Sequence, residues 1–215
     1  MDLDIYKQFP EMKYFIGKNY VPGGKKALLV IGESNYLPEG SEIWKDPVKW
    51  YSSSSADLTD DEREWINISG IMNDEASKGK GFPNPAHSIF RLGFQKINEY
   101  GPKYSDYRDI LDDIVFYNYF LRPAENGDSI VPFLEQIDME IADQHFEDIV
   151  SMLKPRGIVF LSRGAASRCS KINSLTIPCA KAPHPGCKYW NIKCDCYGNR
   201  HGCDVVQDGL ADLSW

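Results

Sequence analysis

Four short apolar runs divide the chain, and a polar cluster follows each of them. The runs are residues 27–31, 113–120, 158–162 and 175–178. Uninterrupted apolar segments of this length are typical of parallel strands that are covered on both faces. The pattern therefore predicts four strands of one sheet, the fourth being the poorest.

Segments with a helical period lie between these runs. The clearest is 138–153, where apolar residues and His145 form one stripe that ends at Pro155. A capping box of Thr59 and Glu62 predicts a helix to about Met72. Asn84 and Pro85 predict the start of another, which ends near residue 100. Shorter helices are expected within the first twenty residues, which are rich in aromatics, and at 164–168.

The alternation of strands and helices predicts a three-layer α/β/α fold with a mainly parallel four-stranded sheet. A chain of 215 residues suits a single domain spanning 1–215. No apolar run approaches the length of a membrane span, and the polar start lacks the features of a secretory signal. A cytoplasmic location, with no membrane partner, is expected. The oligomeric state is not readable from the sequence.

Charge is distributed unevenly along the chain. The net charge is −7, yet residues 151–203 hold nine Lys or Arg and one acid. A basic region within an acidic protein is what a one-sided phosphate-binding surface requires, and it points to DNA as a candidate partner.

The polar clusters that follow the four runs are the candidate ligand site. They contain Gly32 to Tyr36 after the first run, Asn118 after or within the second, Arg163 with Gly164 after the third, and His184 after the fourth. In an open parallel sheet, ligands bind beyond the carboxyl ends of the strands. The sequence therefore predicts that these clusters meet around one ligand.

In this order and spacing, the clusters resemble the motifs of the uracil-DNA glycosylase superfamily across residues 27–191. Gly-Glu-Ser-Asn-Tyr at 32–36 is similar to its first motif, which begins Gly-Gln-Asp-Pro-Tyr or Gly-Glu-Ala-Pro-Gly in different branches. Asn-Tyr-Phe-Leu-Arg-Pro at 118–123 is similar to a strand Asn that precedes Cys-Arg-Pro-Pro. Leu-Ser-Arg-Gly-Ala-Ala at 161–166 and His-Pro-Gly at 184–186 are similar to Leu-Gly-x-x-Ala and His-Pro-Ser.

The resemblance implies roles for three base-contacting side chains. His184 would donate to the O2 oxygen of the base. The Asn118 amide, which carries a donor and an acceptor, would pair with the O4 and N3–H edge of uracil. Tyr36 would exclude the thymine methyl group, and Gly32 begins the motif. Structural alternatives are a stiff Pro-His-Pro turn, a capped strand end and a packed loop aromatic, respectively.

The first motif departs from the most active branch, whose third residue is a water-activating Asp. Ser34 stands there, and a hydroxyl can orient water but cannot act as a carboxylate base near neutral pH. Our hypothesis is that Ser34 or Asn35 positions water while Glu33 orders the loop.

A flipped base also requires stacking and phosphate contacts. Phe82 is the candidate stacking ring, and Gly164 belongs to the substrate-binding set. Tyr189 and Trp190, which lie among lysines, are candidates for contact with DNA together with Lys188 and Arg163. The alternative for Trp190 is packing onto the domain.

All six cysteines lie beyond residue 168. In a reducing cytosol they are expected to be thiols or metal ligands rather than disulfides. Zinc held by Cys187, Cys194, Cys196 and Cys203 is an alternative, although Cys-x-Cys is not the common zinc spacing. No iron–sulfur cluster and no other cofactor is expected.

Three functions remain open. The first is a base-excision DNA glycosylase that hydrolyses the N-glycosidic bond of uracil or a related flipped base. The second is a non-catalytic member of the same superfamily that binds a nucleobase or single-stranded nucleic acid. The third is a small-molecule-binding α/β protein with a zinc-stabilised C-terminal segment.

Overall fold

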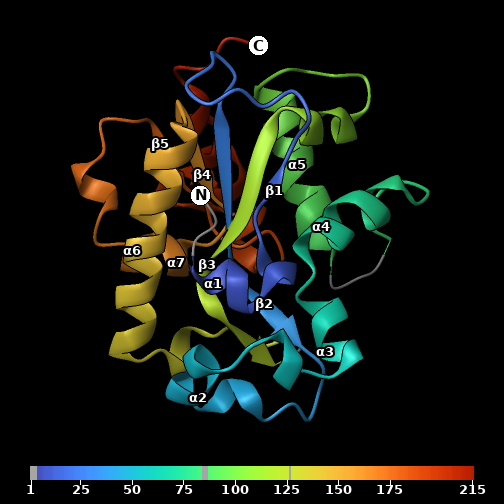
Figure 1. The fold of residues 1–215 in the computed structure, drawn as a ribbon. Coiled ribbons are helices and arrows are strands. Elements are labelled where there is room, and N and C mark those ends of the chain that lie inside the picture. Colours follow the sequence, from blue (N-terminus) through green and yellow to red (C-terminus); the bar gives the residue numbers. More distant parts are fainter. Residues whose placement is uncertain (1–3, 84–86, 126) are drawn as a thin grey trace.

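The computed structural model describes residues 4–83, 87–125 and 127–215. It is an α/β protein built on a five-stranded sheet of order β1-β3-β2-β4-β5 (Figure 1). The strands are β1 (Phe15–Ile16), β2 (Leu28–Leu37), β3 (Ile114–Glu125), β4 (Gly157–Phe160) and β5 (Cys179–Lys181). Strands β3, β2, β4 and β5 are parallel, as predicted, and β1 runs antiparallel to β3.

Two predicted strand assignments are corrected. The fifth strand, β1, comes from the N-terminal segment that was expected to be helical. In that segment helix α1 covers only Asp4–Gln8, and Pro10 opens a separate 3-10 turn before the chain reaches the sheet edge. The fourth parallel strand lies after 175–178, because Pro178 has no N–H to donate and pairing with β4 begins at Cys179.

Helices cover both faces of the sheet, as Figure 1 shows for α6 (Gln136–Leu153) and α5 (Ser88–Tyr100). Alternate residues of β2 pack on opposite faces of the sheet. Leu29 and Ile31 join the apolar core that contains the buried face of α6, whereas Leu28 and Val30 join the core beneath α5. Because a strand alternates its side chains, this explains why the 27–31 run is apolar throughout.

The predicted helix from Thr59 to Met72 is divided. Thr59 forms the expected capping box, its hydroxyl accepting from the Glu62 N–H at 3.2 Å. Helix α3 (Asp60–Trp65) then ends, and Asn67 caps a second start. The second part consists of α4 (Ile68–Gly70) and a π-helical turn at Ile71–Glu75. The predicted opening of the next helix at Asn84 and Pro85 lies outside the described residues.

The remaining elements are short. The α-helices are α2 (Pro47–Ser52) and α7 (Arg163–Arg168), and strands β6 (Lys193–Cys194) and β7 (Arg200–His201) form a small hairpin. The 3-10 segments are Pro10–Met12, Ile43–Lys45, Ser55–Asp57, Tyr107–Asp112, Val131–Phe133, Ile172–Ser174, Lys188–Trp190, Asp195–Tyr197 and Gly202–Leu210. Among the described residues, none of the helices is both long and apolar enough to cross a bilayer.

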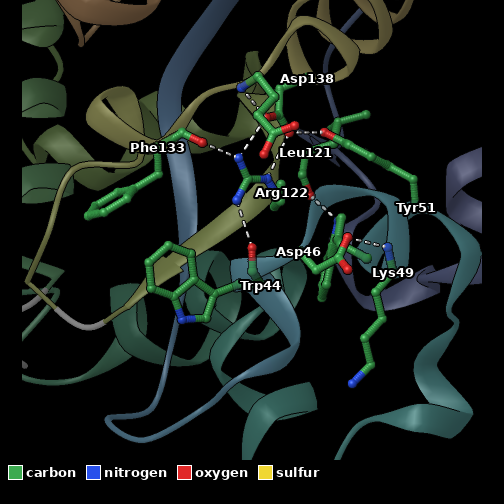
Figure 2. A network of polar contacts seen from close by, with 10 residues as sticks. Trp44, Asp46, Lys49, Tyr51, Leu121, Arg122, Phe133 and Asp138 are labelled. Atoms are coloured by element: carbon green, nitrogen blue, oxygen red, sulfur yellow. Dashed lines mark hydrogen bonds and ion pairs between the residues drawn. The ribbon is translucent and has the colours of Figure 1, made fainter.

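A buried ion pair fastens the carboxyl end of β3 to its surroundings (Figure 2). The Arg122 guanidinium donates to both carboxylate oxygens of Asp138, at 2.9 and 2.6 Å. It also donates to the carbonyl oxygens of Trp44 and Phe133, and the Tyr51 hydroxyl donates to Asp138. The network therefore joins β3, the start of α6 and the 43–51 segment at one point.

His145 of α6 is buried beside Tyr6, whose hydroxyl oxygen lies 2.8 Å from its Nε2. Burial lowers the pKa of His145 to about 4. An exposed histidine has a pKa of about 6.5, so between these values only the unfolded chain binds the proton. Stability is therefore expected to fall by about 2 kcal/mol from pH 7 to pH 5 through this residue.

Urea unfolding at the two pH values measures this loss. His145→Gln should remove about 2 kcal/mol from the pH dependence. An equal pH dependence in wild type and His145→Gln would contradict the assignment.

Candidate functional site

The polar residues after the first apolar run continue the strand instead of forming a loop. Gly32 to Tyr36 belong to β2, and Gly32 is the register partner of Asn118 in β3. The register between the two strands shifts between Ser34 and Tyr36. The site is thus built on two central, adjacent parallel strands, from Gly32 and Asn118 near their middles toward the carboxyl end of β2.

Gly32 is required by the close approach of Asn118. A Cβ atom at position 32 would lie 2.1 Å from Oδ1 of Asn118 and 3.0 Å from the ring of Phe116. No side chain fits in that space, so the glycine is what allows the amide to lie over the neighbouring strand.

Two buried amides form the floor of the site. The Asn118 Nδ2 group donates to Oδ1 of Asn35 at 2.8 Å. Asn35 is 5% exposed, and its own Nδ2 has no hydrogen-bond partner among the described residues. Buried polar groups are almost always paired, so this donor is available to a ligand.

His184 reaches the same cavity from the loop that follows β5. The Gly186 N–H donates to its Nδ1 at 3.2 Å. This contact assigns the proton of the neutral ring to Nε2, which is then a donor. Burial lowers the pKa of His184, although Glu33 acts in the opposite direction. At neutral pH the imidazole is therefore an uncharged donor.

Glu33 is held by hydroxyl groups from two other segments. The Ser129 and Ser162 hydroxyls donate to its two carboxylate oxygens. Ser162 also caps α7 by accepting from the Ala165 N–H. Gly164 lies beside this contact, since a Cβ there would be 3.1 Å from the Glu33 carboxylate. Glu33 therefore ties β2 to the start of α7.

These residues surround a cavity of about 420 Å³, a volume within the range of small-ligand pockets. Gly32, Glu33, Ser34, Asn35, Tyr36, Asn118 and His184 all line it. Burial raises the pKa of Tyr36, so its hydroxyl stays protonated near neutral pH. The structure thus brings together the candidates from three of the four polar clusters. Gly164 and Arg163, from the fourth, do not border this cavity in the described part of the chain, which corrects the prediction that all four meet.

Sequence reasoning missed much of the opposite wall. Trp65, Phe90 and Phe116 contribute rings, and residues 61–78 contribute several charged groups. Phe90 lies on the buried face of α5, and its ring also borders the cavity. The 61–75 residues reach the cavity through the packing of α3 beside β2, and no local sequence signal indicates that packing.

Two aromatic predictions are corrected. Phe82 is fully buried and does not border the cavity among the described residues; its ring packs against Phe90 and Phe94. Its backbone adopts a φ of 49° directly after Gly81, and the turn directs the ring into the core. Trp190 is 1% exposed and packs in the core beneath α5, so it cannot stack on a base.

The other three DNA-contact candidates are more accessible. Tyr189 is 44% exposed, and the Lys188 ammonium lies 5.0 Å from the centre of its ring. Arg163 packs over Tyr197 and borders a second, open cavity of about 370 Å³ with Lys181 and Arg200. Three cationic side chains around a hollow suit phosphate contact, although Arg200 is already paired with Asp208.

The C-terminal cysteines are not gathered into one cluster in the described part of the chain. Cys194 and Cys196 form a disulfide, which corrects the expectation of thiols for this pair; a 3-10 turn brings their Cα atoms within 5.2 Å. Cys169, Cys179, Cys187 and Cys203 are free. Within 4–83, 87–125 and 127–215, no three His, Cys, Asp or Glu side chains are arranged to hold a metal ion.

Comparison of the chain with protein-family models, with curated proteins and with solved structures finds no match.

Proposed function

We propose that this chain hydrolyses the N-glycosidic bond of a flipped DNA base, uracil or a related base, and that its fold is of the uracil-DNA glycosylase type. The observation that carries the proposal is the convergence of Asn118 and His184 on one cavity beside Gly32. These are the groups that the motif resemblance assigns to base recognition, Asn118 from within β3 and His184 from the loop that follows β5. The parallel order β3-β2-β4-β5 supports the proposal because these four strands run toward the same edge of the sheet.

In the proposed reaction the bond between C1′ and the base nitrogen breaks, and its electron pair leaves with the base. Water forms the new bond to C1′, and its proton neutralises the departing uracil anion. A positioned donor lowers the energy of such an anion. The Nε2–H group of His184 would donate to the base O2, and the Asn118 and Asn35 amides would bind its edge.

Water would be held by the Ser34 hydroxyl or the Asn35 amide. Glu33 is engaged by two serine hydroxyls, which suits its role in ordering the strand end. Because a serine hydroxyl cannot accept the proton as a carboxylate does, we expect slower turnover than in a relative with Asp at this position.

The test is excision of uracil from labelled single- and double-stranded oligonucleotides. Abasic products are cleaved with alkali and separated on a denaturing gel. Strand breaks that require both uracil and protein are expected. An absence of breaks on either substrate, with protein in large excess over DNA, would contradict the proposed reaction.

The second candidate function is binding of a nucleobase or single strand without cleavage. Ser34, in place of a carboxylate, is the observation that favours it. The same oligonucleotides distinguish the two, since binding without breaks is expected here. Affinity should fall steeply with salt, because phosphate contacts release counterions. A flat salt response would remove nucleic acid as the partner.

A further inference from the structure

The cavity proposed to hold the base is strongly acidic. Among the described residues that line it are five carboxylates and one lysine: Glu33, Asp61, Glu64, Asp74, Glu75 and Lys78. Lys78 is paired with Glu75 at 2.7 Å. Burial lowers the pKa of both lining histidines, His87 and His184, so neither adds a positive charge at neutral pH.

Three of these carboxylates are exposed on the side formed by α3 and the π-helical turn. Asp61, Glu64 and Asp74 form no ion pair with any described residue. Trp65 lies among them and is half-buried, and Phe90 and Phe116 border the same cavity. Carboxylates together with aromatic faces favour a positively charged planar ligand over an anion.

Buried Asn35 is the independent indication that this cavity takes a ligand. Its side chain is 95% buried and lines the cavity, and its Nδ2 donor has no partner in the described part of the chain. A base with ring acceptors would satisfy that donor. The carboxylates and the unpaired Asn35 donor therefore belong to the same candidate binding site.

An acidic cavity is unfavourable for a uracil anion. Negative charge that develops on the leaving base would be repelled by the surrounding carboxylates, and a neutral His184 offers only a dipole against it. A base that is already cationic has no such difficulty, because it departs as a neutral molecule.

We propose that the favoured substrate is DNA carrying a cationic N-alkylated purine, with 7-methylguanine as the model. This inference rests on the proposed glycosylase function. The C1′–N9 bond breaks, and its electron pair neutralises the positive ring. Water bonds to C1′ through its oxygen and releases one proton to solvent. No base stronger than water is required, which agrees with Ser34 at the water-positioning residue.

The test compares excision from two oligonucleotides of identical sequence, one with uracil and one with 7-methylguanine at the same position. A reaction without protein subtracts spontaneous depurination. Wild type is expected to release 7-methylguanine at least about tenfold faster than uracil. A modest electrostatic attraction between the carboxylates and the cationic base gives a ratio of this size.

The triple variant Asp61→Asn, Glu64→Gln, Asp74→Asn should lower 7-methylguanine release by about tenfold without lowering uracil release. The matched variant Glu140→Gln, Glu147→Gln, Asp212→Asn makes the same charge change at exposed carboxylates elsewhere, and it should behave as wild type.

The outcomes separate the two proposals. Faster release of uracil than of 7-methylguanine would overturn the cationic substrate and leave the glycosylase function standing. Equal 7-methylguanine rates in the two triple variants would overturn it as well. Release of neither base would overturn both.

Discussion

Asp138→Asn is expected to lower the free energy of unfolding by about 3–5 kcal/mol, because it leaves the Arg122 guanidinium buried without its partner charge. Both side chains are at most 1% exposed, so water cannot replace the lost carboxylate. Arg122→Met should lower the free energy of unfolding by a similar amount, because it leaves the Asp138 carboxylate buried without its partner charge. Urea unfolding followed by tryptophan fluorescence measures both.

Two controls belong to this experiment. The double variant Arg122→Met, Asp138→Asn should lose less than the sum of the single losses, because no unpaired charge remains. Arg200→Met breaks the exposed, two-pronged ion pair with Asp208 and should cost no more than about 1 kcal/mol. If Asp138→Asn cost as little as Arg200→Met, the buried network would not hold this end of the sheet.

His184→Ala and Asn118→Ala are each expected to lower the rate of base excision by about a hundred- to a thousandfold. In the proposed mechanism His184 would supply a neutral donor to the base oxygen, and Asn118 would supply half of the amide floor. Single-turnover kinetics with protein in excess separates the chemical step from binding. The expected effect lies in that step for His184→Ala and also in substrate affinity for Asn118→Ala.

His201→Ala is the matched control for these rates. His201 lies in the β6–β7 hairpin and does not border the cavity. It should retain wild-type rates. Full activity in either His184→Ala or Asn118→Ala, with unchanged urea midpoints, would remove that residue from the proposed mechanism.

Three of the four parallel strands and the long helix could be predicted, because their apolar patterns are clear from the sequence alone. Residues 27–31 are buried on both faces, and α6 has an unbroken stripe. The extension of β2 through Glu33–Tyr36 could not, because these polar residues pair with β3 through backbone groups that any residue has. The β1 strand has only two residues, too few for a detectable alternation.

The floor of the site was predictable, and its far wall was not. Gly32 and His184 follow predicted strands and Asn118 lies within one, and parallel strands run toward the same edge of the sheet. Trp65, Asp61 and Glu64 border the cavity because α3 packs beside β2. That packing depends on the path of residues 38–58, which connect the two elements, and not on a local sequence pattern. Trp190 was a candidate for DNA contact because it lies among lysines in the sequence. It is buried instead, because its ring has a large apolar surface that packs in the core.

The short strand β1 has a consequence for association between molecules. It pairs with Val115 and Phe116 on the outer edge of β3, a twelve-residue strand whose residues are almost all buried. Without the segment that carries Phe15 and Ile16, the N–H and C=O groups of that edge would be open to a strand from another chain. The segment that carries β1 therefore protects this part of the sheet edge. Its removal is expected to promote association of molecules through edge-to-edge strand pairing.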